Sequence, residues 1–157
     1  MTVTYCVGDM FTVDSPRALA HGCNCAGAMG KGIAVIFRKK WPAMYSRYKE
    51  LCKDGFFSLG DVFEWNDGIT TIYNLGTQKT WKTKADILAI RKSLEELHRL
   101  AIDSGVFEIY MPRIGAGLGG LDWSDVKKVI ESVFGVSSIQ VYVCEDFLVG
   151  AQLQIKN

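Results

Sequence analysis

The chain has 157 residues, of which 48% are hydrophobic and 22% charged, and its formal net charge is +1. This length suits one globular domain, the composition excludes a disordered chain, and the near-neutral charge argues against a broad basic face for nucleic acid. We therefore expect a single domain over residues 1–157. The sequence has neither an apolar run long enough for a membrane span nor a signal-peptide pattern. Five scattered cysteines favour reduced thiols, so we expect a cytoplasmic protein without a membrane partner.

The secondary structure is predicted from hydrophobic spacing, β-branched and aromatic runs, and turn signals such as Asn66-Asp67-Gly68. In chain order we expect strands at 2–8 and 17–23, two helices within 33–53 interrupted at Pro42, strands at 61–65 and 69–75, a helix at 84–103, a strand at 106–111, a helix at 124–134 and a strand at 138–144. Alternating strands and helices late in the chain indicate crossover connections and parallel pairing. The sequence therefore predicts a three-layer α/β domain with a central mixed sheet.

Two glycine-rich loops each follow a predicted strand and precede a predicted helix. The first glycine loop, residues 24–32, carries Gly30 and Gly32, and the second glycine loop covers residues 115–120. Glycine lets the backbone approach a ligand closely, and the free N–H groups at a helix start attract anions. If the two strands are parallel, both loops lie at one edge of the sheet and a diphosphate fits between them. The alternative for the first glycine loop is a tight turn.

The second glycine loop also matches the dinucleotide fingerprint G-x-G-x-x-G at Gly115, Gly117 and Gly120. That fingerprint belongs in an opening βαβ unit, but here fewer than forty residues follow it. No room remains for a second nucleotide-binding half, so a nicotinamide-dependent oxidoreductase is disfavoured and we expect no cofactor.

Polar residues follow several predicted strands. The side chains of Asn24, Thr77 and Gln78 offer donors and acceptors that suit sugar hydroxyls or an oriented water, although each could instead bond its own backbone. Asp9 follows the first strand and would either accept from a ligand amine or hydroxyl, or cap a turn. Asp122 would either cap the last helix or act as a general base beside the second glycine loop.

Histidine and cysteine give little indication of catalysis. His21 lies in an apolar strand and is expected to be a buried, hydrogen-bonded histidine. Cys23 and Cys25 lack partners for a zinc site, and burial is more common than reactivity at a strand end, so we expect no metal. Trp81 and Trp123 lie close in sequence to the candidate loops, and a local basic patch remains compatible with the neutral overall charge.

Three stretches of the sequence resemble the macro domain: Gly8-Asp9, residues 24–34 and residues 111–123. They are most similar to the branch of the terminal ADP-ribose glycohydrolases, DarG antitoxins and yeast-type ADP-ribose 1″-phosphate phosphatases. The resemblance covers about residues 3 to 144 and implies an α/β/α sandwich that binds ADP-ribose, free or on an ADP-ribosylated macromolecule. A nucleic acid would be bound only if it carries ADP-ribose as a substrate. We expect the protein to be a monomer.

The resemblance also implies roles for individual residues. Asp9 would bind the adenine amine, with Tyr142 near the adenine, and Asn24 would lie at the distal ribose. Backbone N–H groups would hold the diphosphate. The implied ligand contacts are Asp9, Met10, Gly30, Gly32, Ile33, Thr77, Ile114, Gly115, Ala116, Gly117, Leu118, Gly119 and Tyr142.

Two positions depart from the pattern of this branch. Gln78 stands where glycohydrolases and antitoxins place a catalytic lysine, and Gly119 stands where the vertebrate hydrolases place an aspartate. The resemblance then implies attack at C1″ by a water that Asn24 and Gln78 position, with Asp122 as a further catalytic candidate. The implied activity is a metal-independent ADP-ribosyl hydrolase acting on acidic side chains or other O-linked acceptors, or an ADP-ribose 1″-phosphate phosphatase. The alternative is a reader that binds ADP-ribose without turnover.

Overall fold

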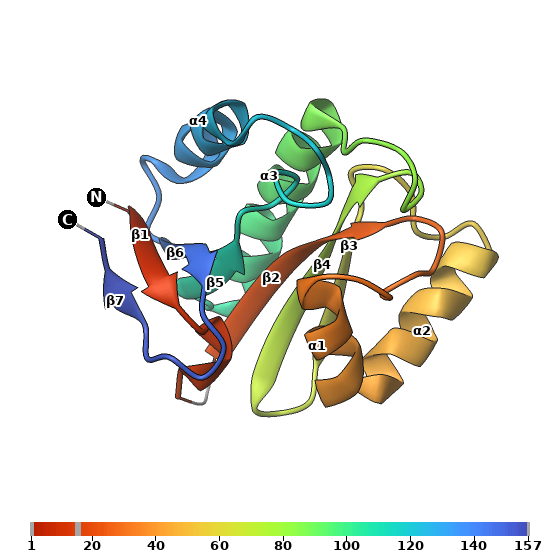
Figure 1. Cartoon of the computed structure of the whole chain (residues 1–157), viewed down its shortest axis with the longest axis horizontal. Helices are drawn as coiled ribbons and strands as arrows, with labels where there is room; N and C mark the ends of the chain where they lie inside the picture. Colours follow the sequence, from red (N-terminus) through yellow and green to blue (C-terminus); the bar gives the residue numbers. More distant parts are fainter. Residues whose placement is uncertain (1, 15–16, 157) are drawn as a thin grey trace.

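The computed structural model describes residues 2–14 and 17–156. Its middle layer is a seven-stranded sheet with strand order β3-β4-β2-β5-β6-β1-β7 (Figure 1). The elements in chain order are β1 (Val3–Gly8), the short 3₁₀ helix η1 (Met10–Thr12), β2 (Arg17–Asn24), α1 (Ile33–Lys40), α2 (Pro42–Lys53), β3 (Val62–Asn66), β4 (Thr70–Gln78), α3 (Ile87–Ser104), β5 (Glu108–Pro112), α4 (Trp123–Phe134), β6 (Gln140–Phe147) and β7 (Gln154–Ile155).

The sheet is mixed, as the sequence predicted. β1, β2, β4, β5 and β6 pair in parallel, whereas β3 and β7 pair antiparallel at the two edges. Because β2 and β5 are parallel neighbours, the two glycine loops that follow them emerge at the same edge of the sheet. The prediction that both loops share one edge is therefore confirmed.

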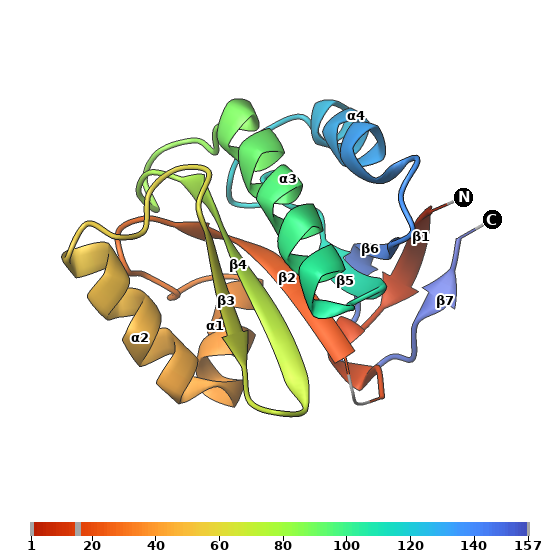
Figure 2. The same cartoon turned by 180° about the vertical axis from the view of Figure 1, so that it is seen from behind.

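Helices cover both faces of the sheet, which completes the predicted sandwich (Figures 1 and 2). α3 and α4 cover one face over a core that includes Leu94, Ile130 and Val141. α1, α2 and η1 cover the other face, where Phe37 and Tyr48 are fully buried. None of the helices in residues 2–14 and 17–156 has the length and apolar character needed to cross a membrane.

Local signals account for most element boundaries. Pro42 occupies the first turn of α2, where its missing N–H costs no helical hydrogen bond. Gly105 ends α3 in the left-handed conformation that glycine adopts without strain. The sequence missed η1 and β7, and it ended β4 and β6 three residues early. β6 continues because its pairing with β1 persists to Gly8 and Phe147, a long-range effect that local pattern does not reveal.

Candidate functional site

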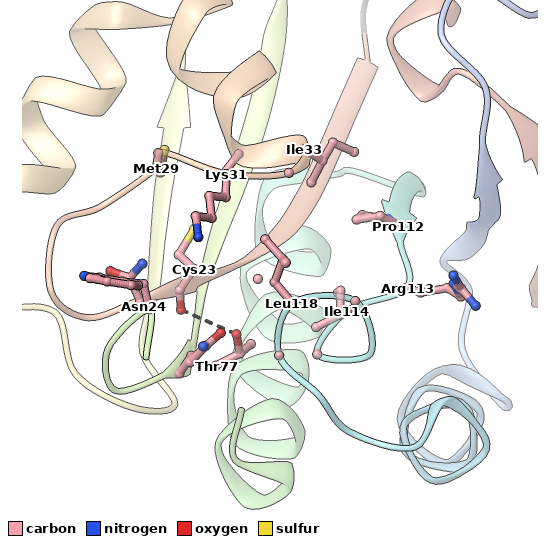
Figure 3. A pocket seen from close by; sticks show the side chains of 18 of the residues that line it. Cys23, Asn24, Met29, Lys31, Ile33, Thr77, Pro112, Arg113, Ile114 and Leu118 are labelled. Atoms are coloured by element: carbon pink, nitrogen blue, oxygen red, sulfur yellow. Dashed lines mark hydrogen bonds between the residues drawn. The ribbon is translucent and has the colours of Figure 1, made fainter. Parts of the chain in front are cut away.

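A cavity of about 630 Å³ opens at the carboxyl edge of the parallel strands (Figure 3). This volume lies within the range of roughly 300–1,000 Å³ that is typical of small-molecule sites. The walls are residues 28–34, the ends of β2 and β4, the second glycine loop with the segment 112–114 before it, and the end of β6. Both glycine loops therefore line one cavity, at the place where ligands bind in open α/β sheets.

The first glycine loop presents free backbone donors to this cavity. Gly30, Lys31 and Gly32 line it, and within the described chain their N–H groups donate to no other residue. Gly32 has φ +63°, a left-handed conformation that suits glycine, and it is followed directly by the first residue of α1. The loop and the start of the helix together form an anion-binding arrangement.

The second glycine loop presents a similar set from the opposite side. The N–H groups of Gly115, Gly117 and Leu118 find no acceptor among the described residues, and all three residues line the cavity. Ala116 differs, because its N–H donates to the carbonyl of Arg113 (3.3 Å) and the residue does not line the cavity. The predicted contact from Ala116 is therefore not supported by the geometry.

The two loops approach each other closely. Figure 3 shows the Leu118 side chain reaching from the second glycine loop toward the first. A Cβ placed on Gly32 would lie 3.3 Å from Leu118 Cδ1, so the leucine packs directly over that glycine. Gly119 is also confined, since a Cβ there would lie 2.6 Å from the carbonyl oxygen of Gly115. A side chain at position 119 would thus force this loop to move.

Asn24 and Gln78 meet at the β2–β4 end of the cavity. The two residues are register partners on the neighbouring strands β2 and β4, and both line the cavity. The N–H of Cys25 donates to the carbonyl of Gln78 (2.8 Å), which fixes the two strand ends together. The structure therefore places the two predicted water-positioning residues side by side. Thr77 is buried below them and donates its hydroxyl to the carbonyl of Cys23 (3.4 Å).

The amide side chains of Asn24 and Gln78 differ in how many of their hydrogen-bond donors and acceptors are already occupied. Asn24 Oδ1 accepts from the N–H groups of Ala26 (3.0 Å) and Ala28 (3.2 Å), and its Nδ2 donates to the Ala28 carbonyl (2.8 Å). Asn24 therefore shapes the first glycine loop, and its second N–H finds no acceptor among the described residues. Gln78 Nε2 donates to the carbonyl of Thr83, and its Oε1 receives no hydrogen bond from the described residues. That oxygen can accept from a water or a sugar hydroxyl.

The opposite end of the cavity, at β6, is aromatic and charged. Phe147 lines it at the end of β6 and packs edge-on against Phe11, with 6.1 Å between ring centroids. Glu145 is the carboxylate that lines the cavity within residues 2–14 and 17–156. Burial opposes its ionisation, but the hydrogen bond from Trp123 (2.7 Å) and two lysine ammonium groups lower the pKa of Glu145 below its ordinary value. Glu145 is therefore an ionised group held by neighbouring cations rather than a proton acceptor near neutral pH.

The structure places Asp9 and Met10 outside the cavity. Asp9 Oδ1 accepts from the N–H of Phe11 (2.8 Å) and Oδ2 accepts from the N–H of Gly150 (2.8 Å), so both oxygens are occupied. Asp9 caps η1 and ties it to the loop after β6, which is the turn-capping alternative that the sequence left open. Met10 is fully buried in the core.

Tyr142 and Asp122 also lie outside the cavity. Tyr142 pairs with Tyr110 in the middle of the sheet, where the rings stack with 4.7 Å between centroids. The aromatic side chain at the site is Phe147 instead, which the sequence missed because the strand was predicted to stop at residue 144. Asp122 is exposed and caps α4 by accepting from the N–H of Ser124 (2.9 Å). Hydrogen bonds from Ser124 lower its pKa, so we assign Asp122 to capping and not to general-base catalysis.

The predicted burial of His21 and Cys23 is confirmed, whereas Cys25 is only half-buried. His21 is fully buried, bonds Asn74 Oδ1 through Nε2 (2.7 Å) and stacks on Phe37. Burial lowers the pKa of His21 to about 4 although the Asn74 hydrogen bond opposes this, so the ring is neutral. Burial and the neighbouring Cys52 raise the pKa of Cys25 to about 12, and burial raises that of Cys23 well above its ordinary value. Both thiols are therefore protonated. The described residues contain no group of three or more His, Cys, Asp or Glu that could hold a metal ion.

Comparison with known proteins defines the class that the fold and the two loops indicate. Residues 20–130 match the Macro domain family, and the chain therefore belongs to that family. Among solved structures, the macrodomain of Mycobacterium tuberculosis DarG has a TM-score of 0.84 and 32% identity, with 90% of this chain and 96% of that chain covered.

The curated relatives include three differently named enzymes. The DNA ADP-ribosyl glycohydrolase of Mycobacterium tuberculosis is 35% identical over 136 residues, which are 84% of this chain and 38% of the relative. This chain thus spans well under half of that protein. The ADP-ribose glycohydrolase OARD1 of Homo sapiens is 35% identical over 141 residues, 90% of each chain. The ADP-ribose 1″-phosphate phosphatase of Candida albicans is 30% identical over 155 residues, with 90% of this chain and 99% of the relative covered.

Proposed function

We propose that the protein binds ADP-ribose in this cavity and hydrolyses the bond between its distal ribose and an acceptor group. The observation that carries the proposal is the pair of glycine loops. Residues of both loops line one cavity and have N–H groups without an acceptor among the described residues, with Asn24 and Gln78 at one end of the cavity and Phe147 at the other. The names of the curated relatives support it, since all three are hydrolases of ADP-ribose compounds.

The order of the strands indicates how ADP-ribose would be oriented along the cavity. From β4 to β6 the cavity edge crosses β2 and β5, a distance of about 14 Å at the usual spacing of strands. The diphosphate would lie in the middle, where the loops after β2 and β5 face each other. Phe147 would then contact the adenine ring, and Asn24 and Gln78 would lie at the distal ribose.

Hydrolysis at this end would depend on positioning. Gln78 Oε1 and the free N–H of Asn24 would hold a water against C1″. The water oxygen forms a bond to C1″, the bond from C1″ to the acceptor oxygen breaks, and the acceptor leaves with the electron pair. The proton of the water passes to the leaving group or to a substrate phosphate. Orientation of two reactants can lower a barrier by several kcal/mol, up to roughly 7–11 kcal/mol in good cases.

The proposal is tested by calorimetry with ADP-ribose, followed by incubation of the same sample with glutamate-linked ADP-ribosylated protein and with ADP-ribose 1″-phosphate. Release of ADP-ribose or of phosphate identifies the leaving group. Gln78→Ala should lower turnover about 10- to 100-fold, the effect of losing one hydrogen bond that orients a reactant. Gln154→Ala on the exposed edge strand β7 is the matched control and should leave turnover unchanged. Absence of ADP-ribose binding would refute the proposal.

A reader that binds without turnover is the second candidate. The observation that favours it is the position of the cavity's carboxylate: Glu145 lies at the β6 end, three strands away from Gln78. Within the described residues, no carboxylate lines the Asn24 end as a general base. Calorimetric binding of ADP-ribose with no product after overnight incubation would select the reader.

A further inference from the structure

A groove at the β3 edge of the sheet is separate from the cavity between the glycine loops. This β3 groove has a volume of about 820 Å³ and is lined by residues of β3, of α3, and of the end of α2 with the loop that follows it. β3 is the last strand on this side of the sheet, and α3 lies alongside (Figure 2). None of the described residues that line the groove also lines the cavity.

The backbone of β3 leaves hydrogen-bonding groups free along this edge. At the two ends of the β3–β4 pair, the Asp61 carbonyl accepts a backbone hydrogen bond from β4 (2.8 Å) and the Asp67 N–H donates one to β4 (3.2 Å). Because antiparallel hydrogen bonds occur at every second residue, the odd-numbered residues of β3 face β4. The N–H and carbonyl groups of Val62 and Glu64 therefore point away from the sheet, and no other described residue hydrogen-bonds them.

The groove carries more negative than positive charge. Its charged lining residues are four carboxylates and two cations: Asp61, Glu64, Glu95, Glu96, Lys92 and Arg99. Arg99 is already paired with Glu96 and with Asp103, which lies outside the groove. Glu64 and Glu95 have no ion-pair partner in the part of the chain that the structure describes. The groove is therefore complementary to a positively charged ligand.

The side of the groove toward α2 is apolar. Leu51 at the end of α2 and Phe56 in the following loop line it, and Phe56 is 75% exposed. Phe63 of β3 packs against the core under α1 and α2, whereas Val62 packs against the core under α3. Side chains alternate along a strand, so Glu64 shares the α3 face with Val62. The edge strand thus has carboxylates on its α3 side and apolar side chains on its α2 side.

A buried hydroxyl group without a hydrogen-bond partner lies next to Glu64. Tyr73 is the register partner of Glu64 on β4 and is fully buried. Its hydroxyl finds no hydrogen-bond partner among residues 2–14 and 17–156. Burial and the Glu64 carboxylate raise the pKa of Tyr73, which indicates that the two groups are close. An ammonium group held by Glu64 would offer this oxygen the partner that it lacks.

We propose that β3 pairs with an extended segment of a partner protein in which basic and apolar residues alternate, and that this segment adds to the sheet as an eighth strand. Directly opposite residues of paired strands share a face, with about 4.5–5.5 Å between their Cβ atoms. A basic residue opposite Glu64 therefore faces the α3 carboxylates, and its neighbours in the segment face the apolar side. Backbone hydrogen bonds supply affinity in such strand addition, and alternate side chains supply specificity.

A second copy of this chain fits the β3 groove less well than a basic segment. Its own β3 would bring a second Glu64 among the same carboxylates, and like charges on paired strands are destabilising. The opposite edge strand, β7, has only two residues. The inference does not depend on the proposed function, because the groove and the cavity share no described residue.

The test measures the binding of a fluorescein-labelled peptide of eight alternating lysine and valine residues by anisotropy. A peptide with glutamate in place of lysine should bind at least about tenfold more weakly, because like charges then meet. Glu64→Ala should weaken binding of the lysine peptide about two- to fivefold through loss of a cross-strand charge pair. Glu64→Pro removes the same charge and also the outward N–H, which an edge strand tolerates, so affinity should fall about fivefold further.

The controls separate binding at the groove from general attraction and from misfolding. Asp125→Ala removes an exposed carboxylate at the start of α4 and should bind the lysine peptide like the unmodified protein. Each variant should keep the circular dichroism spectrum of the unmodified protein. Amide hydrogen exchange on the unmodified protein needs no substitution, and the lysine peptide should slow exchange at Val62 and Glu64.

Three results would overturn the inference. The first is equal binding of the lysine and glutamate peptides, and the second is equal affinity of Glu64→Pro and Glu64→Ala for the lysine peptide. The third is a dimer of the protein alone, seen by sedimentation, that Glu64→Pro dissociates, since a second copy would then occupy the edge. Failure to bind ADP-ribose in calorimetry would refute only the proposed function.

Discussion

Replacing Gly30 by alanine tests whether phosphate groups approach the backbone of the first glycine loop. A Cβ on Gly30 would meet no atom of residues 2–14 and 17–156 within 4 Å, and the φ of Gly30 is not in the left-handed region. The folded protein should therefore accept the methyl group without strain. Because alanine restricts the unfolded chain, the free energy of unfolding should stay constant or rise by up to about 0.4–1 kcal/mol.

The affinity of Gly30→Ala for ADP-ribose should nevertheless fall at least tenfold, a loss of about 1.4 kcal/mol in binding free energy. The added methyl group occupies space that the phosphate oxygens need in order to reach the N–H groups of the loop. Gly119→Ala, unlike Gly30→Ala, should strain the folded protein even without ligand, because its Cβ would lie 2.6 Å from the Gly115 carbonyl oxygen. That substitution should lower the free energy of unfolding by about 1–3 kcal/mol, as overpacked sites do.

Calorimetry with ADP-ribose and urea unfolding should be carried out on the same preparations of the unmodified protein and both variants. Gly117→Ala is a second test of the same kind on the second glycine loop, since a Cβ there also meets no atom within 4 Å in the described part of the chain. Unchanged ADP-ribose affinity in Gly30→Ala and Gly117→Ala would mean that neither loop contacts the diphosphate, and the site would have to be reassigned.

Three further predictions concern residues whose positions the structure decided. Phe147→Ala should weaken ADP-ribose binding about tenfold in calorimetry, whereas Tyr142→Ala should bind normally, because only Phe147 lines the cavity. Asp122→Ala should lower the thermal unfolding midpoint through loss of the α4 cap and leave turnover unchanged; a large fall in turnover would restore the general-base assignment. The third prediction is pH dependence. The pKa of His21 is about 4 in the folded protein against 6.5 for the unperturbed side chain, so the unfolded chain alone takes up a proton as the pH falls between these values. Stability should fall by up to about 3 kcal/mol over this range, and urea unfolding of His21→Gln should not show that part of the pH dependence.

Short-range patterns in the sequence were sufficient for the fold class and for the two glycine loops. The helix break at Pro42, the left-handed Gly105 and the Asn66-Asp67-Gly68 turn are each determined within a few residues, because they depend on backbone conformations that only certain residues adopt. The same is true of the free N–H groups of the loops, which follow from glycine content and the start of α1.

Contacts between residues that are far apart in the sequence could be assigned only from the tertiary structure. Asn24 and Gln78 become neighbours only through the register of β2 against β4, and Phe147 enters the cavity only because β6 continues its pairing with β1. Asp9 was ambiguous for the same reason: its second carboxylate oxygen is occupied by the N–H of Gly150, at the other end of the chain.

The sequence by itself determined that two glycine loops, each between a strand and a helix, would present backbone donors, since glycine content and strand-loop-helix order impose this locally. The parallel pairing of β2 with β5 then brought both loops to one edge of the sheet. Only the tertiary structure decided which side chains surround those donors. Strand register, a long-range property, brought Gln78 to Asn24. The hydrogen bonds from Gln78 to the Thr83 carbonyl and from the Ala85 N–H to the Gly119 carbonyl hold the segment that brings Trp81 to the cavity. The hydrophobic pattern fixes which face of a strand is buried, but which distant strands become neighbours depends on contacts across the whole sheet.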